Sequence, residues 1–440
     1  MRIRLGAALL VALFSLCLRV GFGEAPLCVA QDGCAALLTE AGEEIVPLGQ
    51  YADLIDLGGE GDAWRCAAGV RTDAGILYGL MDATGALRTS CAYSSIRRAG
   101  TVFLIAAEDR MGAINAQGEV VLPMEYTQLV AFDEAHFLAL RSDPYDAEPD
   151  EIYAVNARAE TRSATGCRAE NGLNPVKSGR MLWQDADTER YGYMNAEGES
   201  VIAADYPQAR PFQGDWAEAL QDGLWGVLNT DGSWNIEPRY AWIERLQGGA
   251  VAIGLLPEGG FELRSLAEDG GETLVFPQEF SADIVNDKVV LRSAEETRIL
   301  LPDGQLLWSG AANAQVFAGC GDSLLLMDGQ WGDSCAALLY ADGRLSAARW
   351  QWLVPLDGAH YAQVQMEATR YYSYHLKRDK NKINYRSFRY GVIDAQGGEV
   401  LPCAYDSVAL VVENRYLLTL GETLLLANEQ GEILWSREAP

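Results

Sequence analysis

Positive charge and histidine are both scarce in this chain of 440 residues. Lysine and arginine number 34 against 62 aspartate and glutamate residues, so the net charge is −28 at pH 7 and the isoelectric point lies near 4.4. A surface of that sign repels nucleic acid phosphates and anionic lipid headgroups alike. The composition therefore argues against nucleic acid as a partner, and we expect the excess of acidic groups to serve solubility.

The usual metal and catalytic motifs are absent from the sequence as well. The chain has three histidines, His136, His360 and His375, and no Cys-x-x-Cys pair, which argues against a zinc site. It contains no His-Glu-x-x-His, no Gly-x-Ser-x-Gly, no phosphate-binding loop and no Gly-x-Gly-x-x-Gly that opens a helix. We therefore predict no metal, no cofactor and no catalytic residues.

No hydrophobic run is long enough to span a membrane comfortably. The run at residues 5–18 is fourteen residues without a charge and ends before Arg19, whereas a span needs about 20 residues. Small residues, Gly21 and Gly23, follow it, so the pattern predicts a secretory signal peptide over residues 1–23 with cleavage after Gly23. We expect a mature chain that is secreted or associated with the cell envelope. Its net charge would be −31, because cleavage removes three arginines and no acidic residue.

Cysteine is neither abundant nor absent. The mature chain would keep eight cysteines, an even number that is compatible with disulfides in an exported protein. Two candidate pairs, Cys28–Cys34 and Cys320–Cys335, would each close a short loop. In the alternative, most of the cysteines are buried thiols that pack as small hydrophobic side chains.

Sustained helical periodicity is missing, and a different pattern recurs in its place. Its most complete copy is WGVLNTDGSWNIEPRYAWI, residues 225–243. Trp225 and Gly226 open a short apolar run, and the absent side chain of Gly226 predicts close approach of another backbone or ring. A turn follows in which Gly232 suits a positive φ. Tyr240 then supplies a ring with a polar tip for a half-buried position.

The pattern repeats along most of the chain. Clear copies begin at Tyr78, Met111, Tyr191 and Tyr390, so that Gly192 and Gly391 are equivalent to Gly226. With the weaker copies there are ten or eleven repeats of about 35–40 residues, a period typical of repeat architectures. An Asp or Asn recurs after the apolar run, and this recurrence indicates a turn role rather than catalysis.

These features resemble the WG-repeat, or KWG-repeat, proteins of bacteria. The match consists of an aromatic–Gly pair, a short apolar run, Asp/Asn-x-x-Gly, a further apolar pair, often Pro, and then Tyr. It covers nearly all of the chain after the first twenty-odd residues, although only the copy at Trp225 keeps Trp-Gly intact. The resemblance implies a repeat class and brings no catalytic residues with it.

An all-β fold is predicted for residues 24–440. Each period offers about four short extended runs, and the 45 glycines and many turn dipeptides point in the same direction. Four strands in about 40 residues is the size of a propeller blade. One or more β-propeller-like rings are therefore favoured, with an open β superhelical stack as the alternative. Repetition is weakest at residues 141–190, where a division into halves would fall.

One insertion, residues 366–390, departs from the repeat. It has seven basic residues against two acidic ones, interleaved with aromatic rings, and predicts a long hairpin with its tip near Asp379. Tyr and Arg are frequent in interface hot spots, so the hairpin is a candidate site for an acidic protein or an anionic cell-envelope polymer. In the alternative, its charges neutralise acidic repeats of the same chain. The candidate residues are Arg370, Tyr371, Tyr372, Tyr374, Lys377, Arg378, Lys380, Lys382, Tyr385 and Arg386.

Two functions remain compatible with the sequence. The favoured one is a non-catalytic exported repeat protein that acts as a binding or scaffold surface for protein or cell-envelope ligands. The alternative is a propeller-type carbohydrate-active enzyme with clustered carboxylates. Such an enzyme needs two carboxyl groups roughly 5–10 Å apart, and nothing in the sequence singles out such a pair.

Overall fold

The computed structural model describes residues 25–141, 150–158, 161–169, 172–246, 251–266, 273–328, 335–346, 350–370 and 384–438. These residues contain forty-one strands, one 3-10 turn, η1 (Gly61–Ala63), and no α-helix. Within them no helix has the length and apolar character that crossing a membrane requires. The predicted signal peptide, residues 1–23, lies outside the described residues.

The strands form eleven antiparallel sheets in the described part of the chain, each of three or four strands. Strands that are consecutive in sequence are neighbours in each sheet, which is the meander of a propeller blade. The predicted all-β fold of ten or eleven propeller-type repeats is therefore confirmed, with eleven blades.

The blades fall into two compact units. The first unit comprises Tyr51–Ala282 and Pro302–Gly304 and holds six blades, and residues 141–190 lie inside it rather than at its boundary. The six blades are β4 (Asp53–Gly58), β5 (Arg65–Thr72) and β6 (Gly75–Asp82); β7 (Ser95–Ala99), β8 (Val102–Ala107), β9 (Arg110–Ile114) and β10 (Val120–Tyr126); β11 (Gln128–Ala131), β12 (His136–Leu140), β13 (Asp150–Asn156) and β14 (Thr161–Ala169); β15 (Val176–Lys177), β16 (Arg180–Gln184), β17 (Tyr191–Met194) and β18 (Ser200–Tyr206); β19 (Gln208–Ala209), β20 (Trp216–Gln221), β21 (Leu224–Asn229) and β22 (Trp234–Tyr240); β23 (Trp242–Arg245), β24 (Val251–Leu255), β25 (Phe261–Ser265) and β26 (Leu274–Phe276).

The second unit is built from Met1–Gln50, Asp283–Leu301 and Gln305–Pro440, and the described residues place five blades mainly in it. These are β1 (Leu27–Gln31), β2 (Cys34–Leu38) and β3 (Glu44–Tyr51); β27 (Ser281–Val285), β28 (Lys288–Arg292), β29 (Glu296–Leu300) and β30 (Leu306–Ala311); β31 (Gln315–Ala318), β32 (Leu324–Asp328) and β33 (Cys335–Leu339); β34 (Trp352–Pro355), β35 (His360–Arg370), β36 (Asn384–Asp394) and β37 (Glu399–Tyr405); β38 (Ser407–Val412), β39 (Arg415–Leu420), β40 (Thr423–Asn428) and β41 (Ile433–Glu438).

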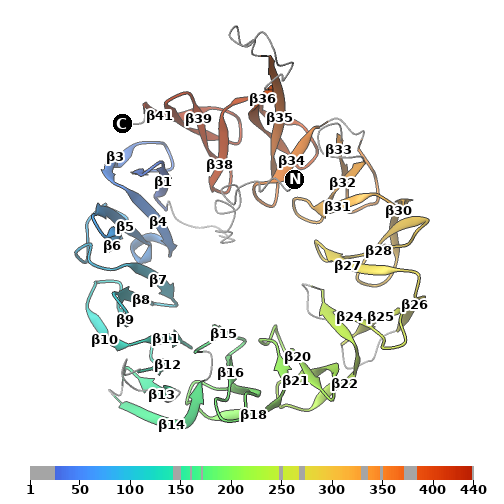
Figure 1. The fold of residues 1–440 in the computed structure, drawn as a ribbon. Coiled ribbons are helices and arrows are strands. Elements are labelled where there is room, and N and C mark those ends of the chain that lie inside the picture. The colour runs from blue at the N-terminus through green and yellow to red at the C-terminus, as the bar shows by residue number, and fades with distance from the viewer. Residues whose placement is uncertain are drawn as a thin grey trace, which may run out of the picture. The chain divides into compact units, whose positions relative to one another are not determined.

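Apolar cores join consecutive blades within each unit. In the first unit, for example, Leu80 of β6 packs with Phe103 of β8, and both side chains are fully buried. In the second unit, Leu27 and Val29 of β1 pack with Leu417 of β39, and β1 lies beside β38 (Figure 1). The first and last blades of the chain are thus packing partners, so the repeat stack has no exposed apolar end at this junction.

The recurrent sequence pattern occupies the third and fourth strands of a blade. Trp225 pairs with Tyr240 and Val227 pairs with Ile236, so three residues of β22 face the single residue Gly226 of β21. This bulge brings β22 down onto the glycine: a Cβ at Gly226 would lie 2.6 Å from the carbonyl oxygen of Ile236. The close approach predicted at Gly226 is therefore present.

Equivalent positions repeat the arrangement. A Cβ at Gly192 would lie 2.7 Å from the Ile202 carbonyl oxygen, and one at Gly391 would lie 2.7 Å from that of Leu401. Gly232 has a φ of +84°, as its turn position requires. Tyr240 is 1% exposed, which places it in the core rather than in a half-buried seam.

The two candidate disulfides are not formed by the described cysteines. In the β1–β2 hairpin Cys28 faces Leu37 and Cys34 faces Gln31, which offsets the two cysteines by about 10 Å along the strand, beyond the reach of a disulfide. Cys320 is buried without a disulfide, and its Sγ donates to the carbonyl oxygen of His360 at 2.8 Å. Burial raises the pKa of the Cys320 thiol to about 12. The side chain of its proposed partner, Cys335, lies outside the described residues. Short spacing suggested these pairs, but strand register decides which side chains meet.

Candidate functional site

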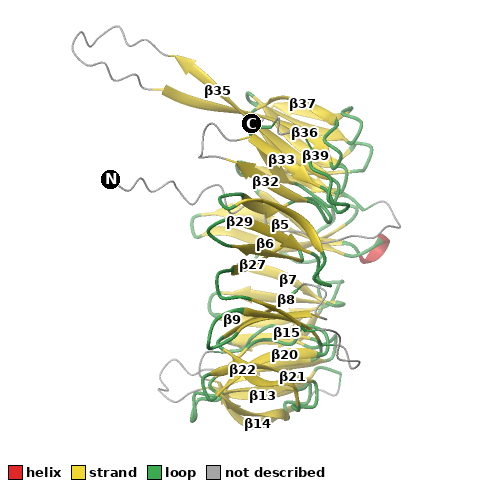
Figure 2. Cartoon of the chain, turned by 90° about the vertical axis from the view of Figure 1, so that its right-hand side faces the viewer, coloured by secondary structure: helices red, strands yellow, loops and turns green. Residues whose placement is uncertain are grey.

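The insertion forms a β-ribbon from β35 and β36, which pair in register from His360 opposite Asp394 to Arg370 opposite Asn384. β34 pairs with β35 only as far as Val364, and β37 pairs with β36 only as far as Tyr390. Beyond these points β35 and β36 pair with each other alone, and the ribbon extends away from its blade (Figure 2). The predicted hairpin is confirmed, while its predicted tip near Asp379 lies outside the described residues.

The ribbon brings together three of the predicted binding residues. Arg370 is the last residue of β35, and Tyr385 and Arg386 face Thr369 and Ala368 across the ribbon. These three backbone positions therefore lie at the outer end of the paired segment. The other candidates, Tyr371, Tyr372, Tyr374, Lys377, Arg378, Lys380 and Lys382, fall between the two strands and outside the described residues.

The base of the ribbon is anchored to its own unit. Arg389 forms an ion pair with Asp406, whose other carboxylate oxygen accepts the Gly421 N–H at 2.7 Å. Phe388, the next residue outward, is 47% exposed. Neutralisation within the chain thus accounts for Arg389, and the apolar ring of Phe388 remains available to a partner.

A second feature, an Asp–His turn between the first and second strands of two blades, was not recognised from the sequence. In the segment FDEAH, Asp133 Oδ1 accepts two turn N–H groups, and its Oδ2 lies 2.9 Å from His136 Nδ1. In LDGAH, Asp357 accepts the equivalent two N–H groups at 2.7 Å and lies 3.1 Å from His360 Nδ1. Two of the chain's three histidines therefore occupy one structural position, and the shared Asp-x-Ala-His letters were the available signal.

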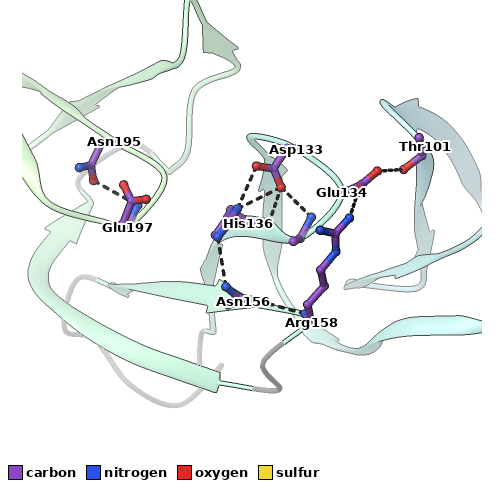
Figure 3. Close-up of polar contacts among 9 residues, drawn as sticks. Thr101, Asp133, Glu134, His136, Asn156, Arg158, Asn195 and Glu197 are labelled. Carbon is purple, nitrogen blue, oxygen red and sulfur yellow. Dashed lines mark hydrogen bonds and ion pairs between the residues drawn. The ribbon is translucent and has the colours of Figure 1, made fainter.

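The neighbours of His136 assign its tautomer. The Arg158 N–H donates to Asn156 Oδ1 at 3.1 Å, which orients the amide so that Nδ2 donates to His136 Nε2 at 3.1 Å (Figure 3). An imidazole that accepts at Nε2 carries its proton on Nδ1, where Asp133 accepts it. His136 is thus held between an amide and a carboxylate, an arrangement that fixes the turn.

A cavity of about 450 Å³ with a mixed polar and apolar lining lies next to this turn, between the blades of β7–β10 and β11–β14. Its charged lining residues are Glu134 and Arg158, which form an ion pair, and Glu134 also accepts from Thr101 Oγ1 at 2.8 Å (Figure 3). Each charged group on the cavity wall already has a partner. The cavity therefore gives no specific indication of a ligand.

His360 is more enclosed than His136 and faces Asp394 in place of an asparagine. The hydrogen bond with Asp357 raises the pKa of His360 against the effect of burial, and the charges of Asp357, Glu429 and Asp394 act in the same direction. For Asp357, burial opposes ionisation, but hydrogen bonds from His360 and from the turn N–H groups lower the pKa. The imidazole meets the ring of Tyr416 edge-on at 5.6 Å between centroids. Since Tyr416 belongs to the next blade, the charged pair supports a contact between blades.

We expect the variant His360→Gln to lose a stabilising contribution that depends on pH. Because the folded-state pKa is raised, this contribution is fully present below the ordinary histidine value of about 6.5 and is lost as pH rises through the folded-state value. Thermal melting of wild type and variant from about pH 5 to 8.5 should show the largest difference at the acid end. His136→Gln is the matched control, because it changes the equivalent turn at a histidine that faces an asparagine instead of a carboxylate. A difference that stays constant with pH would contradict the prediction.

Several carboxyl groups in the described residues accept hydrogen bonds within their own turns. Where the pKa of a carboxyl group is clearly shifted it is lowered, in each case by hydrogen bonds from its own turn; these groups are Asp82, Asp133, Asp231, Asp342 and Asp357. A glycosidase acid requires the opposite shift. No group of three His, Cys, Asp or Glu side chains is placed to hold a metal ion in the described part of the chain.

Comparison with known families identifies the repeat. A model of the WG containing repeat matches residues 111–139, 191–225, 225–253 and 390–421. Each match begins on the third strand of one blade and ends in the following blade. The sequence repeat is therefore offset from the blade and spans the junction between two consecutive blades.

Comparisons with individual proteins are more distant. No curated protein matches the chain. Among solved structures, a eukaryotic initiation factor is similar at 9% identity with a TM-score of 0.44, covering 84% of this chain and 94% of its own. BamB from Moraxella catarrhalis is similar at 12% identity and a TM-score of 0.29, covering 70% and 89%. AztD from Citrobacter koseri is similar at 10% identity and a TM-score of 0.28, covering 73% and 93%.

Proposed function

Starting from a chain that carries WG repeats on propeller-type blades, we propose that it is an exported, non-catalytic binding protein of the cell envelope. The blades serve as a stiff scaffold, and the ribbon of β35 and β36 engages an acidic protein or an anionic envelope polymer. One observation carries the proposal: the outer part of the ribbon, from Met366 opposite Phe388 to Arg370 opposite Asn384, extends beyond the strands that flank β35 and β36 in their own sheet. A paired ribbon that leaves its blade presents both of its faces to a partner.

Charge supports an acidic partner. The insertion has seven basic and two acidic residues in a chain whose net charge is −28. Only Arg389 among its basic residues lies at the ribbon base, where Asp406 neutralises it. The remaining basic residues belong to the outer ribbon or to the segment between its strands, where basic and aromatic residues together suit an interface.

The proposal is non-catalytic because the carboxylates at the recurrent Asp/Asn position serve the turns. Asp394, for example, occupies the recurrent Asp/Asn position and accepts the N–H groups of Gln396 and Gly398 at 2.9 and 2.7 Å. The lowered pKa of the shifted carboxyl groups supports the same conclusion.

We expect replacement of Lys377, Arg378, Lys380 and Lys382 by Ser to weaken partner capture without lowering the melting temperature. These charges should act mainly on the association rate and should be screened by salt, with a Debye length of about 10 Å at 0.1 M. Capture from a cell-envelope extract by immobilised mature protein, beginning at Glu24, measures the effect. Treating that extract with a protease before capture separates a protein partner from a polymer.

The control matches the charge change. The double variant Lys380→Ser/Lys382→Ser is compared with Arg71→Ser/Arg141→Ser, which removes two exposed positive charges outside the ribbon. Replacing Tyr372 and Tyr374 by Ala should speed dissociation instead, since aromatic contacts hold a formed complex. If the basic-residue variant captured the partner as well as wild type does, or if it unfolded, the result would favour the alternative in which the basic charges neutralise acidic repeats of the same chain.

A further inference from the structure

A cavity of about 470 Å³ lies between the first strands of two neighbouring blades, β4 and β7. Both are edge strands of their sheets, so the cavity opens between two sheet edges rather than inside a blade core. Its volume lies within the range of small-ligand sites, which is about 300–1,000 Å³. It belongs to the first unit and shares no residue with the ribbon.

Charge on the cavity wall is reversed relative to the chain. Arg97 and Arg98 line it, and Asp56 is the single acidic residue among its described lining residues. Arg98 is used within the structure: its Nη1 donates to the Gly58 carbonyl oxygen at 2.6 Å and its Nε to that of Gly100 at 2.8 Å. Arg98 therefore fixes β7 against the neighbouring blade and does not turn toward a ligand.

Arg97 differs from Arg98 in both exposure and partners. Residues alternate along β7, with Ile96 4% exposed and Arg97 on the exposed face. The Arg97 guanidinium makes no hydrogen bond or ion pair with the residues that the structure describes, although the chain carries 62 acidic residues. An arginine held on a strand beside a cavity, without an internal counter-ion, is a ready donor for a bidentate anion.

The other walls supply apolar and hydroxyl groups. Ile55 of β4 is 41% exposed in the cavity. Tyr78 donates its hydroxyl to Asp53 Oδ2 at 2.9 Å, and burial together with that carboxylate raises the pKa of Tyr78 to about 12. Its phenol is thereby held neutral and oriented, which leaves the ring for packing. Ser95 adds a hydroxyl next to Arg97 on β7.

We propose that this cavity binds an anionic saccharide unit. The acid group pairs with Arg97, sugar hydroxyl groups bond to Ser95, and the apolar face of the sugar packs on Ile55 and Tyr78. Carboxylated and phosphorylated sugars share this chemistry. The inference goes beyond the ribbon function, because it assigns a small-ligand site to a different unit of the chain.

Titration of the mature protein with three probes tests the proposal: a glucuronic acid-containing disaccharide, a sugar phosphate and a neutral disaccharide. We expect at least one of the two anionic probes to bind about tenfold or more tightly than the neutral one, since a charge-assisted pair contributes that much. Tighter binding of the glucuronate or of the phosphate identifies the source. The absence of a preference for either anionic probe, by calorimetry and NMR, would overturn the proposal.

The decisive variant is Arg97→Gln, which should reduce the affinity for the preferred anionic probe by about tenfold or more and leave the neutral probe unaffected. It should fold normally, because the side chain has no partner in the described residues. Arg71→Gln removes an exposed arginine of β5, in the blade that contributes Ile55 and Tyr78, outside the cavity and should bind like wild type. Ser95→Ala should weaken both classes of sugar modestly. Unchanged anion preference in Arg97→Gln would refute the site.

Failure here is distinguishable from failure of the proposed ribbon function. The ribbon variant Lys380→Ser/Lys382→Ser should bind all three probes like wild type, and Arg97→Gln should capture the ribbon partner normally. A ribbon variant that lost saccharide binding would instead place the saccharide on the ribbon.

Discussion

Replacing Arg245 by Met is expected to destabilise the protein by about 3–5 kcal/mol, because it leaves Glu218 as a buried charge without its counter-ion. Arg245 Nε lies 2.5 Å from Glu218 Oε1, and Nη2 lies 3.4 Å from Oε2. The two side chains are 1% and 3% exposed. Arg245 Nη1 also donates to the Gln213 carbonyl oxygen at 3.0 Å. The pair joins β23 of one blade to β20 of the preceding one, so the loss should weaken a contact between blades.

Chemical denaturation at pH 7 measures this loss, and a second variant identifies its cause. Arg245→Met/Glu218→Leu removes both charges and should recover most of the stability, since replacing a whole buried pair by apolar groups is often neutral. A double variant as unstable as the single one would indicate lost packing instead.

The sequence was most informative about the strands that carry the recurrent pattern, which are the third and fourth strands of a four-stranded blade. Their path is set by local residues: a glycine under a bulge, an Asx turn and an aromatic that packs into the core. In the copy at Asn195, for example, the side-chain Oδ1 accepts the N–H groups of Glu197 and Glu199 at 3.1 and 2.9 Å. Such contacts span four residues at most, so a repeated pattern reveals them.

The first and second strands were harder to derive, because contacts with other blades determine them. β15 (Val176–Lys177) and β19 (Gln208–Ala209) have two residues each, which leaves no periodicity to read. Two of the second strands, β5 and β16, begin with an arginine that reaches into the next blade. Arg65 Nε donates to the Ala116 carbonyl oxygen at 2.8 Å, and Arg180 Nη2 donates to that of Thr230 at 2.8 Å. These partners lie 50 or so residues away in sequence, so no local pattern indicated them.

The two candidate sites also differ in how far the sequence could predict them. The ribbon was predictable because its composition departs from the repeat around it. The cavity beside Arg97 was not predictable, because it depends on Ile55 and Tyr78 meeting Arg97 across two blades. An exposed arginine in an acidic chain looks like any surface charge until its surroundings are known.

Gly226→Val is expected to destabilise the protein by about 1–3 kcal/mol, the usual cost of forcing extra carbon atoms into a packed interior. The added Cβ would lie 2.6 Å from the Ile236 carbonyl oxygen and 2.8 Å from the Trp234 ring. The ring could rotate away, but the carbonyl belongs to the bulged backbone of β22, which Trp225 and Val227 hold through their pairs on either side. Relief would therefore require the bulge itself to move.

Thermal melting compares the variant with Gly358→Val, where an added Cβ meets nothing within 4 Å and φ is not positive. Gly358→Val should stay within about 0.5 kcal/mol of wild type. A Gly226→Val melting curve that superimposes on wild type would show that β22 does not lie against this glycine, and would remove the reason for the repeated aromatic–Gly pair.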